Sequence, residues 1–238
     1  MVLAAGLGLR MRPVTLTTPK SLIKVGGRTM LDQALDRLQE VGVDSAVVNT
    51  HWLRSKVELH LKTRDVPKIK VSSEVELLET GGGVAKALPL LGSGPFFIVN
   101  ADIVWRNGTK PALYRLAQAW NPEEMDTLLL LVPSARPAAY TGMGDFFMDP
   151  LGKLKRRAER EIAPYVFGGV QIVDPRIFQS APEPPFSMNV LYDRIIQKDR
   201  LFGLVHDGDW YHIGTPDELK NVEAELLEKE GARARQLY

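Results

Sequence analysis

Two glycines and three cations stand close together near the start of the chain. An apolar run of strand length leads into Gly6 and Gly8, and Arg10, Arg12 and Lys20 follow. Glycine lacks the Cβ atom that would keep a ligand from the main chain, and it permits the positive φ that lets several N–H groups point at one anion. An ordinary turn with solvated arginines is the alternative. Because this combination rarely occurs without an anion to bind, we predict a polyphosphate cradle.

The spacing of this stretch excludes two familiar phosphate-binding motifs. The dinucleotide-binding pattern G-x-G-x-x-G would need a glycine at position 11, where the chain has Met11. The P-loop pattern G-x-x-x-x-G-K-[ST] is absent because no Lys-Ser/Thr pair closes the loop. The cradle therefore indicates a different class of phosphate site.

Carboxylates and glycines at two further places extend the candidate site. Residues 96–102 form an apolar run that ends on Asp102. If this strand is central, its carboxyl end faces the cradle, where a hard cation needs an oxygen ligand. Asp102 could instead cap the next segment, but its position favours a metal site.

A second glycine cluster, Gly81 to Gly83, follows Glu79 and Thr80. Thr80 is a suitable helix N-cap, which would put three glycines in the first helical turn. Each glycine in a helix costs about 0.5–1 kcal/mol relative to alanine, so three in a row need a reason beyond a flexible cap. We expect a nucleobase to approach the bare main chain here.

Hydrophobic periodicity predicts alternating strands and helices that would position these residues. Apolar residues at helical spacing indicate a helix over 30–41, and Gly42 follows where a helix often ends. Strand patterns at 45–49 and 68–72 flank a helix expected over 53–61. This order implies parallel strands, and right-handed crossovers put ligands outside their carboxyl ends, where the cradle lies.

The pattern changes in the second part of the chain. A helix over 109–120 and a buried strand over 126–132 come first. A hairpin is then expected over 145–157, followed by a strand over 165–173. Two glycines inside that last strand indicate a bulge or a close backbone approach, or else the geometry of a barrel corner. Thr215 with Glu218, and Pro216 between them, form a capping box at the start of the last helix.

Length, charge and cysteine content exclude several classes of protein. The 238 residues suit one compact domain. The formal net charge is +1, from 30 basic and 29 acidic residues, so we expect no nucleic-acid or membrane partner. The chain has no cysteine, which excludes disulfides, thiolate metal sites and cysteine nucleophiles. No stretch approaches the ~20 apolar residues of a membrane span, and we expect a cytoplasmic protein.

Several motifs resemble the nucleotidyltransferases that join a nucleoside triphosphate to a sugar 1-phosphate and release pyrophosphate. The opening L-A-A-G-x-G-x-R-M-x-P followed by P-K is similar to the signature of that family. E-T-G-G-G resembles its nucleobase-reading loop, and N-A-D at Asp102 resembles its N-G-D. W-Y-H-I-G-T at 210–215 resembles W-x-D-[VI]-G-T, with His212 in place of the aspartate. The likeness is weak over 134–200, where the family's E-K-P element is missing.

The resemblance implies an α/β fold with a Rossmann-like, mostly parallel sheet flanked by helices and a smaller mixed β sugar-binding part. The single domain over 1–238 would have a nucleotide-binding half at about 1–133. The sugar-binding half, with the C-terminal helix, would occupy about 134–238.

The resemblance also implies roles for particular residues. Arg10 would attract the leaving pyrophosphate by its positive charge, and Lys20 would contact the α-phosphate. These two are therefore the candidate catalytic residues. Mg²⁺ would be held by Asp102 and by His212, with Mn²⁺ as a possible substitute; since imidazole is a poor ligand for Mg²⁺, His212 is alternatively a hydrogen-bonding core residue. The candidate nucleotide-binding residues are Leu3, Ala4, Ala5, Gly6, Gly8, Glu79, Thr80, Gly81 and Asn100. The candidate sugar-binding residues are Gly144, Asp145 and Gly168.

The small bacterial members with E-T-G-G-G and G-x-G-D-F suggest the substrate pair UTP and N-acetylmuramic acid 1-phosphate, and hence a role in peptidoglycan recycling. Guanylyl transfer to mannose 1-phosphate is the alternative, because Glu76 or Glu79 offers an acceptor for the amino group of guanine. A nucleotide-binding regulatory subunit without turnover is the alternative from another class, favoured only by His212.

Overall fold

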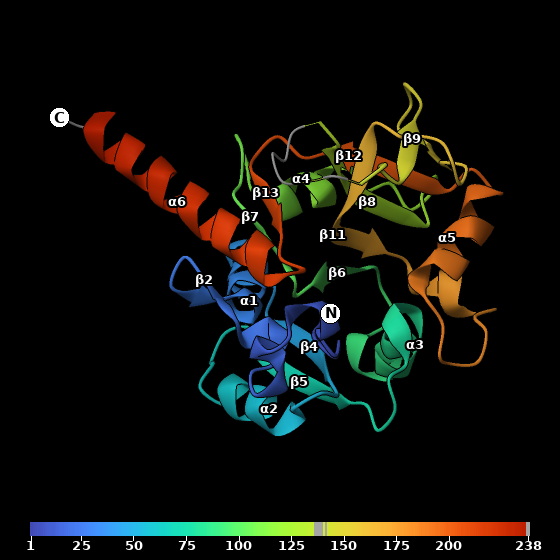
Figure 1. The fold of residues 1–238 in the computed structure, drawn as a ribbon. Coiled ribbons are helices and arrows are strands. Elements are labelled where there is room, and N and C mark those ends of the chain that lie inside the picture. Colours follow the sequence, from blue (N-terminus) through green and yellow to red (C-terminus); the bar gives the residue numbers. More distant parts are fainter. Residues whose placement is uncertain (136–139, 141, 237–238) are drawn as a thin grey trace.

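One mixed sheet of nine strands runs through the middle of the molecule (Figure 1). In this computed structural model, residues 1–135, 140 and 142–236 are described. Within that part of the chain, the strands lie in the order β5-β4-β1-β6-β11-β8-β12, and β9 and β10 continue the sheet beside the start of β11. The strands are β1 (Val2–Leu3), β4 (Ser45–Thr50), β5 (Lys68–Ser73), β6 (Phe96–Asn100), β8 (Thr127–Pro133), β9 (Phe146–Met148), β10 (Leu154–Arg156), β11 (Tyr165–Val173) and β12 (Leu201–Val205).

In the nine-stranded sheet, the strands from the first hundred residues are parallel to one another, as predicted. β1 pairs with β4 on one side and with β6 on the other, and β5 pairs with β4. The register places Asn49 and Asn100 beside Leu3, so three strands reach their carboxyl ends at the same edge of the sheet. The Rossmann-like arrangement is therefore confirmed.

Helices cover both faces of the sheet. Apolar residues of α1, α2 and α4 pack with the strands into one buried cluster, and those of α3 and α5 form another on the opposite face. Each face therefore has its own core, as expected of a doubly wound sheet. The helices are α1 (Met30–Glu40), α2 (Arg54–Leu61), α3 (Glu79–Leu91), α4 (Ala112–Ala119), α5 (Met188–Ile196) and α6 (Pro216–Gln236).

Local signals account for several helix ends. The Thr29 hydroxyl accepts from the Asp32 N–H at 3.0 Å to begin α1, and Gly42 follows the helix with φ +79°. The predicted capping box is present, because the Glu218 N–H donates to the Thr215 hydroxyl at 3.2 Å and the Glu218 carboxylate accepts in return. The helix predicted from residue 109 begins instead at Ala112, directly after a proline.

A strand from the second part of the chain is inserted into the first. β11 lies antiparallel between β6 and β8, so the two halves of the sequence share one sheet. The predicted bulge is present: the register with β8 shifts between Phe167 and Gln171, and Gly169 has φ +75°. A Cβ on Gly169 would lie 3.3 Å from that of Asn100, so the backbone also approaches closely here. The predicted hairpin is formed by β9 and β10.

Two small sheets and the last helix complete the described part. β2 (Lys24–Val25) pairs with β3 (Arg28–Thr29), and β7 (Ile103–Trp105) pairs with β13 (Trp210–His212). α6 leaves the body of the molecule as a long straight helix (Figure 1), with its first turns packed on a third apolar cluster. Among the described helices, none has the length and apolar character needed to cross a membrane.

The segment between β1 and β2 folds as three short 3₁₀ turns, Leu9–Met11, Val14–Leu16 and Lys20–Leu22. Gly8 adopts φ +62°, and the Thr15 hydroxyl donates to its carbonyl at 2.7 Å. The Trp52 indole in turn donates to the Thr15 carbonyl at 2.8 Å. A Cβ on Gly8 would lie 2.8 Å from the Thr15 methyl group and 3.1 Å from the Lys20 Cβ. Glycine here lets the segment fold back and carry Lys20 to the sheet edge.

Candidate active site

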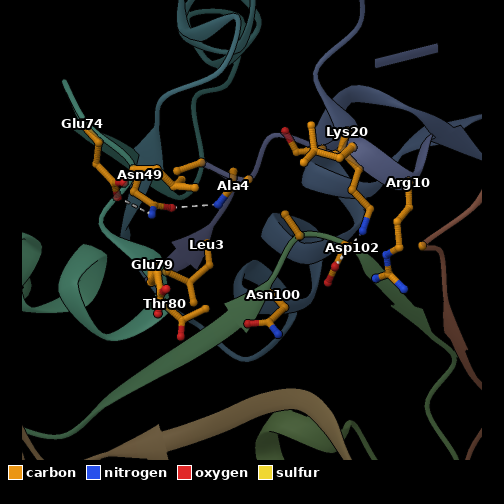
Figure 2. A pocket seen from close by; sticks show the side chains of 18 of the residues that line it. Leu3, Ala4, Arg10, Lys20, Asn49, Glu74, Glu79, Thr80, Asn100 and Asp102 are labelled. Atoms are coloured by element: carbon orange, nitrogen blue, oxygen red, sulfur yellow. Dashed lines mark hydrogen bonds and ion pairs between the residues drawn. The ribbon is translucent and has the colours of Figure 1, made fainter. Parts of the chain in front are cut away.

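A pocket of about 580 Å³ opens at the carboxyl ends of β1, β4 and β6 (Figure 2). This is the edge where the parallel strands were expected to place a ligand. Of the predicted site residues, those that line the pocket are Leu3, Ala4, Ala5, Gly6, Gly8, Arg10, Lys20, Glu79, Thr80, Asn100 and Asp102. Arg12 is exposed and does not line it.

One end of the pocket carries formal charges. The Lys20 ammonium lies 2.8 Å from the Asp102 carboxylate, and the Lys20 side chain is only 14% exposed. Arg10 reaches the same end, where Gly214 makes room for it: a Cβ on Gly214 would lie 3.1 Å from the guanidinium. The segment after β1, which carries Arg10 and Lys20, thus meets Asp102 just after the end of β6, and two cations and one carboxylate come together, which suits a polyphosphate with a metal ion.

His212 lies beside this charged end. Its Nε2 is 3.8 Å from Asp102 and its Nδ1 is 3.5 Å from Glu218, both too long for hydrogen bonds. Burial lowers the pKa of His212 below 6.5; Asp102 opposes the shift and Lys20 adds to it. The imidazole is therefore neutral at pH 7. A neutral ring can bind a metal ion or a phosphate oxygen, but it adds no charge to the site.

The main chain after β1 provides unbonded donors. In the described part of the chain, the N–H groups of Gly6, Leu7 and Gly8 donate to no other group. A Cβ on Gly6 would meet nothing within 4 Å, so its main chain is open to a ligand as predicted. The N–H of Ala4 is not available, because it donates to the Asn49 side chain at 2.7 Å.

The glycines at the start of α3 are explained by packing, whereas the sequence predicted that a nucleobase lies against them. Gly81 does not line the pocket, and its N–H donates to the Phe186 carbonyl at 2.9 Å. The ring of Phe186 occupies the space that a Gly81 side chain would take, and Pro184 approaches Gly82 in the same way. Phe186 therefore accounts for the glycine at position 81 without a nucleobase, and the role of Gly81 toward a nucleotide stays a prediction. Packing against the loop before α5 requires the small residues.

The predicted cap at Thr80 is wrong. Thr80 lies inside α3, and its hydroxyl accepts from the Met188 N–H at 3.0 Å, which fixes the start of α5 against α3. Glu79 begins the helix with φ +59°, a conformation that disfavours residues with a side chain. Strain of this kind is often found where a residue serves a ligand.

Four polar residues that line the pocket were not predicted from the sequence: Ser21, Ser187, Asn49 and Glu74. The last two are hydrogen-bonded to each other. Asn49 is 3% exposed and Glu74 is 1% exposed, and the Asn49 amide donates to the Glu74 carboxylate at 2.7 Å. Both stand where parallel strands end, at the carboxyl end of β4 and directly after β5. A polar residue at the end of one parallel strand and directly after the next was the available signal.

The three predicted sugar-binding residues do not line the pocket. The Asp145 carboxylate accepts from the Phe167 N–H at 2.8 Å and so joins the start of β9 to β11. Gly144 has φ +73° and leaves no room for a Cβ beside the Ala163 carbonyl. Gly168 belongs to the β11 bulge, and its carbonyl accepts from the Trp210 indole at 2.9 Å. Their role toward a sugar stays a prediction.

The residues present fit a divalent cation in part. Mg²⁺ is commonly bound by one or two carboxylates together with substrate phosphates, and Asp102 supplies one carboxylate. Imidazole at His212 suits Mn²⁺ better than Mg²⁺. No group of three or more acidic, histidine or cysteine side chains that could hold a metal occurs among the described residues. The nearby Glu218 is engaged with main-chain N–H groups.

The fold is that of a doubly wound α/β protein, and its pocket lies at the carboxyl ends of the parallel strands. A family model described as the MobA-like NTP transferase domain matches residues 1–167, and the chain belongs to this family. It is 42% identical over 233 residues to the N-acetylmuramate α-1-phosphate uridylyltransferase of Caulobacter vibrioides, with 96% of each chain covered. It is 32% identical to the protein of the same name from Neisseria meningitidis serogroup B, with 94% of this chain and 96% of the relative covered.

A solved structure agrees on the fold. UDP-glucose pyrophosphorylase in complex with UDP-glucose superimposes with a TM-score of 0.81 over 96% of this chain and 97% of its own, at 15% sequence identity. Weaker similarity, 28% identity, links the chain to a probable mannose-1-phosphate guanylyltransferase of Oryza sativa, of which it spans 61%.

Proposed function

We propose that this protein transfers a uridylyl group from UTP to N-acetylmuramic acid 1-phosphate and releases pyrophosphate. The observation that carries the proposal is the charged end of the pocket, where Lys20, Asp102 and Arg10 meet beside unbonded main-chain donors. Full-length similarity to two N-acetylmuramate α-1-phosphate uridylyltransferases supports the substrate pair. UTP is a cytoplasmic metabolite, and the product is a nucleotide sugar of cell-wall synthesis, so the proposal implies a cytoplasmic enzyme of peptidoglycan recycling.

The proposed reaction forms one phosphorus–oxygen bond and breaks another. A phosphate oxygen of the sugar 1-phosphate attacks the α-phosphorus of UTP, and the bond from that phosphorus to the β-phosphate oxygen breaks. The nucleophile is already an anion, so no general base is needed, and catalysis consists of positioning and charge neutralisation. Lys20 serves the α-phosphate, and Arg10 serves the departing pyrophosphate.

Asp102 is the residue that would hold Mg²⁺, with His212 beside it. A bound divalent cation neutralises phosphate charge and orients the triphosphate. The Lys20 ammonium lies 2.8 Å from the Asp102 carboxylate, and we expect it to exchange that carboxylate for a phosphate oxygen when the triphosphate binds. The proposed sugar site includes Gly144, Asp145 and Gly168, on strands β9 and β11 or next to them.

Guanylyl transfer to mannose 1-phosphate is the second candidate. Glu79 lines the pocket, and its carboxylate is an acceptor that the amino group of guanine can use. A regulatory subunit is the third, because the neutral His212 supplies no charge to a metal site. The presence of Lys20, Arg10 and Asp102 in one pocket argues for turnover.

Pyrophosphate release from the purified protein separates these candidates. The assay compares kcat/KM for UTP, GTP, dTTP, CTP and ATP, each with the 1-phosphates of N-acetylmuramic acid, N-acetylglucosamine, glucose and mannose. We expect UTP with N-acetylmuramic acid 1-phosphate to exceed the other pairs by orders of magnitude, because a wrong base leaves buried polar groups unpaired. A preference for GTP with mannose 1-phosphate would overturn the uridylyl assignment. No release with any pair would favour the regulatory subunit.

A further inference from the structure

A chain of hydrogen bonds runs from the main chain of the pocket to a buried carboxylate (Figure 2). The Ala4 N–H donates to Asn49 Oδ1 at 2.7 Å, and Asn49 Nδ2 donates to Glu74 Oε1 at 2.7 Å. The Leu78 N–H donates to the other carboxylate oxygen, Oε2, at 3.2 Å. The bonds link the ends of β1 and β4 to the segment after β5, at the end of the pocket away from Lys20.

The carboxylate of Glu74 sets the direction of this chain. A carboxylate accepts hydrogen bonds but cannot donate them, so the Asn49 amide must turn its NH₂ group toward Glu74. Its oxygen is then left for the Ala4 N–H. An asparagine amide without such a neighbour could adopt either orientation, and the reversed one would set a donor against the Ala4 N–H.

The peptide that receives this bond is fixed on both sides. The Leu3 carbonyl accepts from the Ala101 N–H at 3.0 Å, and the Ala4 N–H of the same peptide donates to Asn49. Rotation of this peptide plane would break both hydrogen bonds, so the two bonds set the direction from which the main chain leads to the open N–H groups of Gly6 to Gly8. Leu3 and Ala4 themselves form part of the pocket wall.

The same hydrogen bonds explain why the third glycine of α3, Gly83, has no side chain. A Cβ on Gly83 would lie 2.8 Å from Glu74 Oε1 and 2.9 Å from Asn49 Nδ2. Any side chain there would push the carboxylate or the amide out of place. The polypeptide thus has a glycine at the point where α3 approaches the side chains of Glu74 and Asn49.

We propose that Glu74 is a positioning residue for the nucleotide: it orients the Asn49 amide, and Asn49 holds the Leu3–Ala4 peptide in the direction that nucleotide binding requires. The inference rests on the proposed function, since it assumes that this pocket binds a nucleoside triphosphate. Glu74 acts through Asn49. Nucleotide affinity should therefore depend on the order of donors and acceptors, that is, on whether each donor of Ala4, Asn49 and Leu78 faces an acceptor, and not on the charge of Glu74 alone.

Two single substitutions break the order and their combination restores it. Glu74→Gln leaves one acceptor oxygen for two donors, from Asn49 and Leu78, and sets an NH₂ group against one of them. Asn49→Asp sets two carboxylates against each other at the 2.7 Å contact. In the double variant, the new carboxylate at position 49 accepts from the Ala4 N–H and from the new amide at position 74. That amide's oxygen still accepts from Leu78.

The test is calorimetric titration of the full chain with UTP and with GTP, in Mg²⁺ and without a sugar phosphate. We expect each single substitution to weaken binding of the preferred triphosphate by about tenfold or more, the usual cost of a buried polar group left unpaired. The double variant should return to within about threefold of the wild type. In steady-state assays the KM for the sugar phosphate should stay unchanged in all three.

Glu58→Gln is the matched control. Glu58 Oε1 accepts from the hydroxyls of Thr50 at 3.3 Å and Ser73 at 3.0 Å, on the same two strands, but it does not line the pocket. Its substitution should leave nucleotide affinity at the wild-type value.

The outcomes separate this inference from the function on which it rests. If the wild type binds neither UTP nor GTP, both the proposed function and this inference are overturned. If it binds only GTP, the uridylyl assignment is overturned, and the variants are then compared by their affinity for GTP. Single variants that bind like the wild type, or a double variant no better than the singles, overturn the role of Glu74. If the single variants do not fold, the double variant decides the question. A double variant that folds and binds the triphosphate supports the inference, and one that does not fold overturns it.

Discussion

The two ends of the pocket are built in different ways. The phosphate end consists of Lys20, Arg10 and Asp102, partly exposed side chains with formal charges. The opposite end consists of Asn49 and Glu74, which are almost fully buried and bonded to main-chain N–H groups. In the described part of the chain, the Glu74 carboxylate has no cationic partner within salt-bridge distance.

The difference reflects what each end must do. Charge on the ligand changes during the proposed reaction, because pyrophosphate leaves, and side chains that can exchange partners suit that end. The nucleoside does not change, so a rigid network that keeps its direction suits the other. Substitutions at the phosphate end should therefore reduce turnover without affecting folding. Those at the other end should change affinity and stability together.

The largest effect is expected at Asp102. Asp102→Asn keeps the shape of the side chain and removes the charge that a divalent cation needs, so kcat/KM should fall by about 10³-fold or more. The melting temperature should stay within about a degree or two of the wild type, since the Lys20 contact is partly exposed. EDTA should inactivate the wild type and change the variant little. Full activity of the variant with Mg²⁺ would place the metal elsewhere.

Lys20→Ala or Arg10→Ala should lower kcat/KM by roughly 10² to 10³, about 3–4 kcal/mol, the usual cost of one preorganised charge-stabilising contact. Arg12→Ala is the matched control, because Arg12 is an exposed cation of the same segment outside the pocket wall. Its kinetics should be those of the wild type. Equal losses in Arg12→Ala and Arg10→Ala would show that the segment attracts the triphosphate only through its net charge.

His212→Asp should have a smaller effect. If His212 stands in the metal shell, a carboxylate at that position should lower the Mg²⁺ concentration for half-maximal activity by about tenfold. The wild type should accept Mn²⁺ comparatively well, because imidazole suits Mn²⁺ better than Mg²⁺. Titration of activity with each metal measures both effects. An unchanged Mg²⁺ dependence in the variant would place His212 outside the metal shell.

Glu79→Gly should have the smallest effect and opposite signs on stability and binding. Glycine relieves the strained φ of +59° but adds freedom to the unfolded chain, so the free energy of unfolding should rise by about 0.5–1 kcal/mol. Affinity for the triphosphate should fall if the Glu79 carboxylate contacts the ligand. Urea denaturation and calorimetric titration measure the two quantities. A more stable variant that binds nucleotide as well as the wild type would show that Glu79 does not contact the base or ribose.

The sequence predicted the phosphate end better than the opposite end. Arg10, Lys20 and Asp102 were found because cations after a glycine turn, and a carboxylate at the end of an apolar strand, are visible in one short stretch each. Asn49 and Glu74 were missed because they meet only through the order of β1, β4 and β5, which sets pairing and register across the sheet. The packing of the α3 glycines was not predicted for a similar reason, since Phe186 comes from a distant loop.

The fold shows the same limit. Parallel strands and crossover helices followed from local patterns, and so did the capping box before α6. The insertion of β11 between β6 and β8 did not, because the pairing of strands far apart in sequence leaves no local pattern. The pattern of residues in a single stretch predicts a helix or strand and the charges that it carries. Contacts between distant stretches can be predicted only when the order and register of the strands in the sheet are known.

The most direct test of nucleotidyl transfer follows the phosphorus atoms of UTP. The protein is incubated with N-acetylmuramic acid 1-phosphate and with UTP labelled with ³²P at either the α or the γ position. If the protein transfers the uridylyl group, α-label appears in a nucleotide sugar and γ-label in pyrophosphate, with equal amounts of both products. Release of γ-label as inorganic phosphate, or α-label that stays in free nucleotides while pyrophosphate forms, would contradict nucleotidyl transfer to the sugar phosphate.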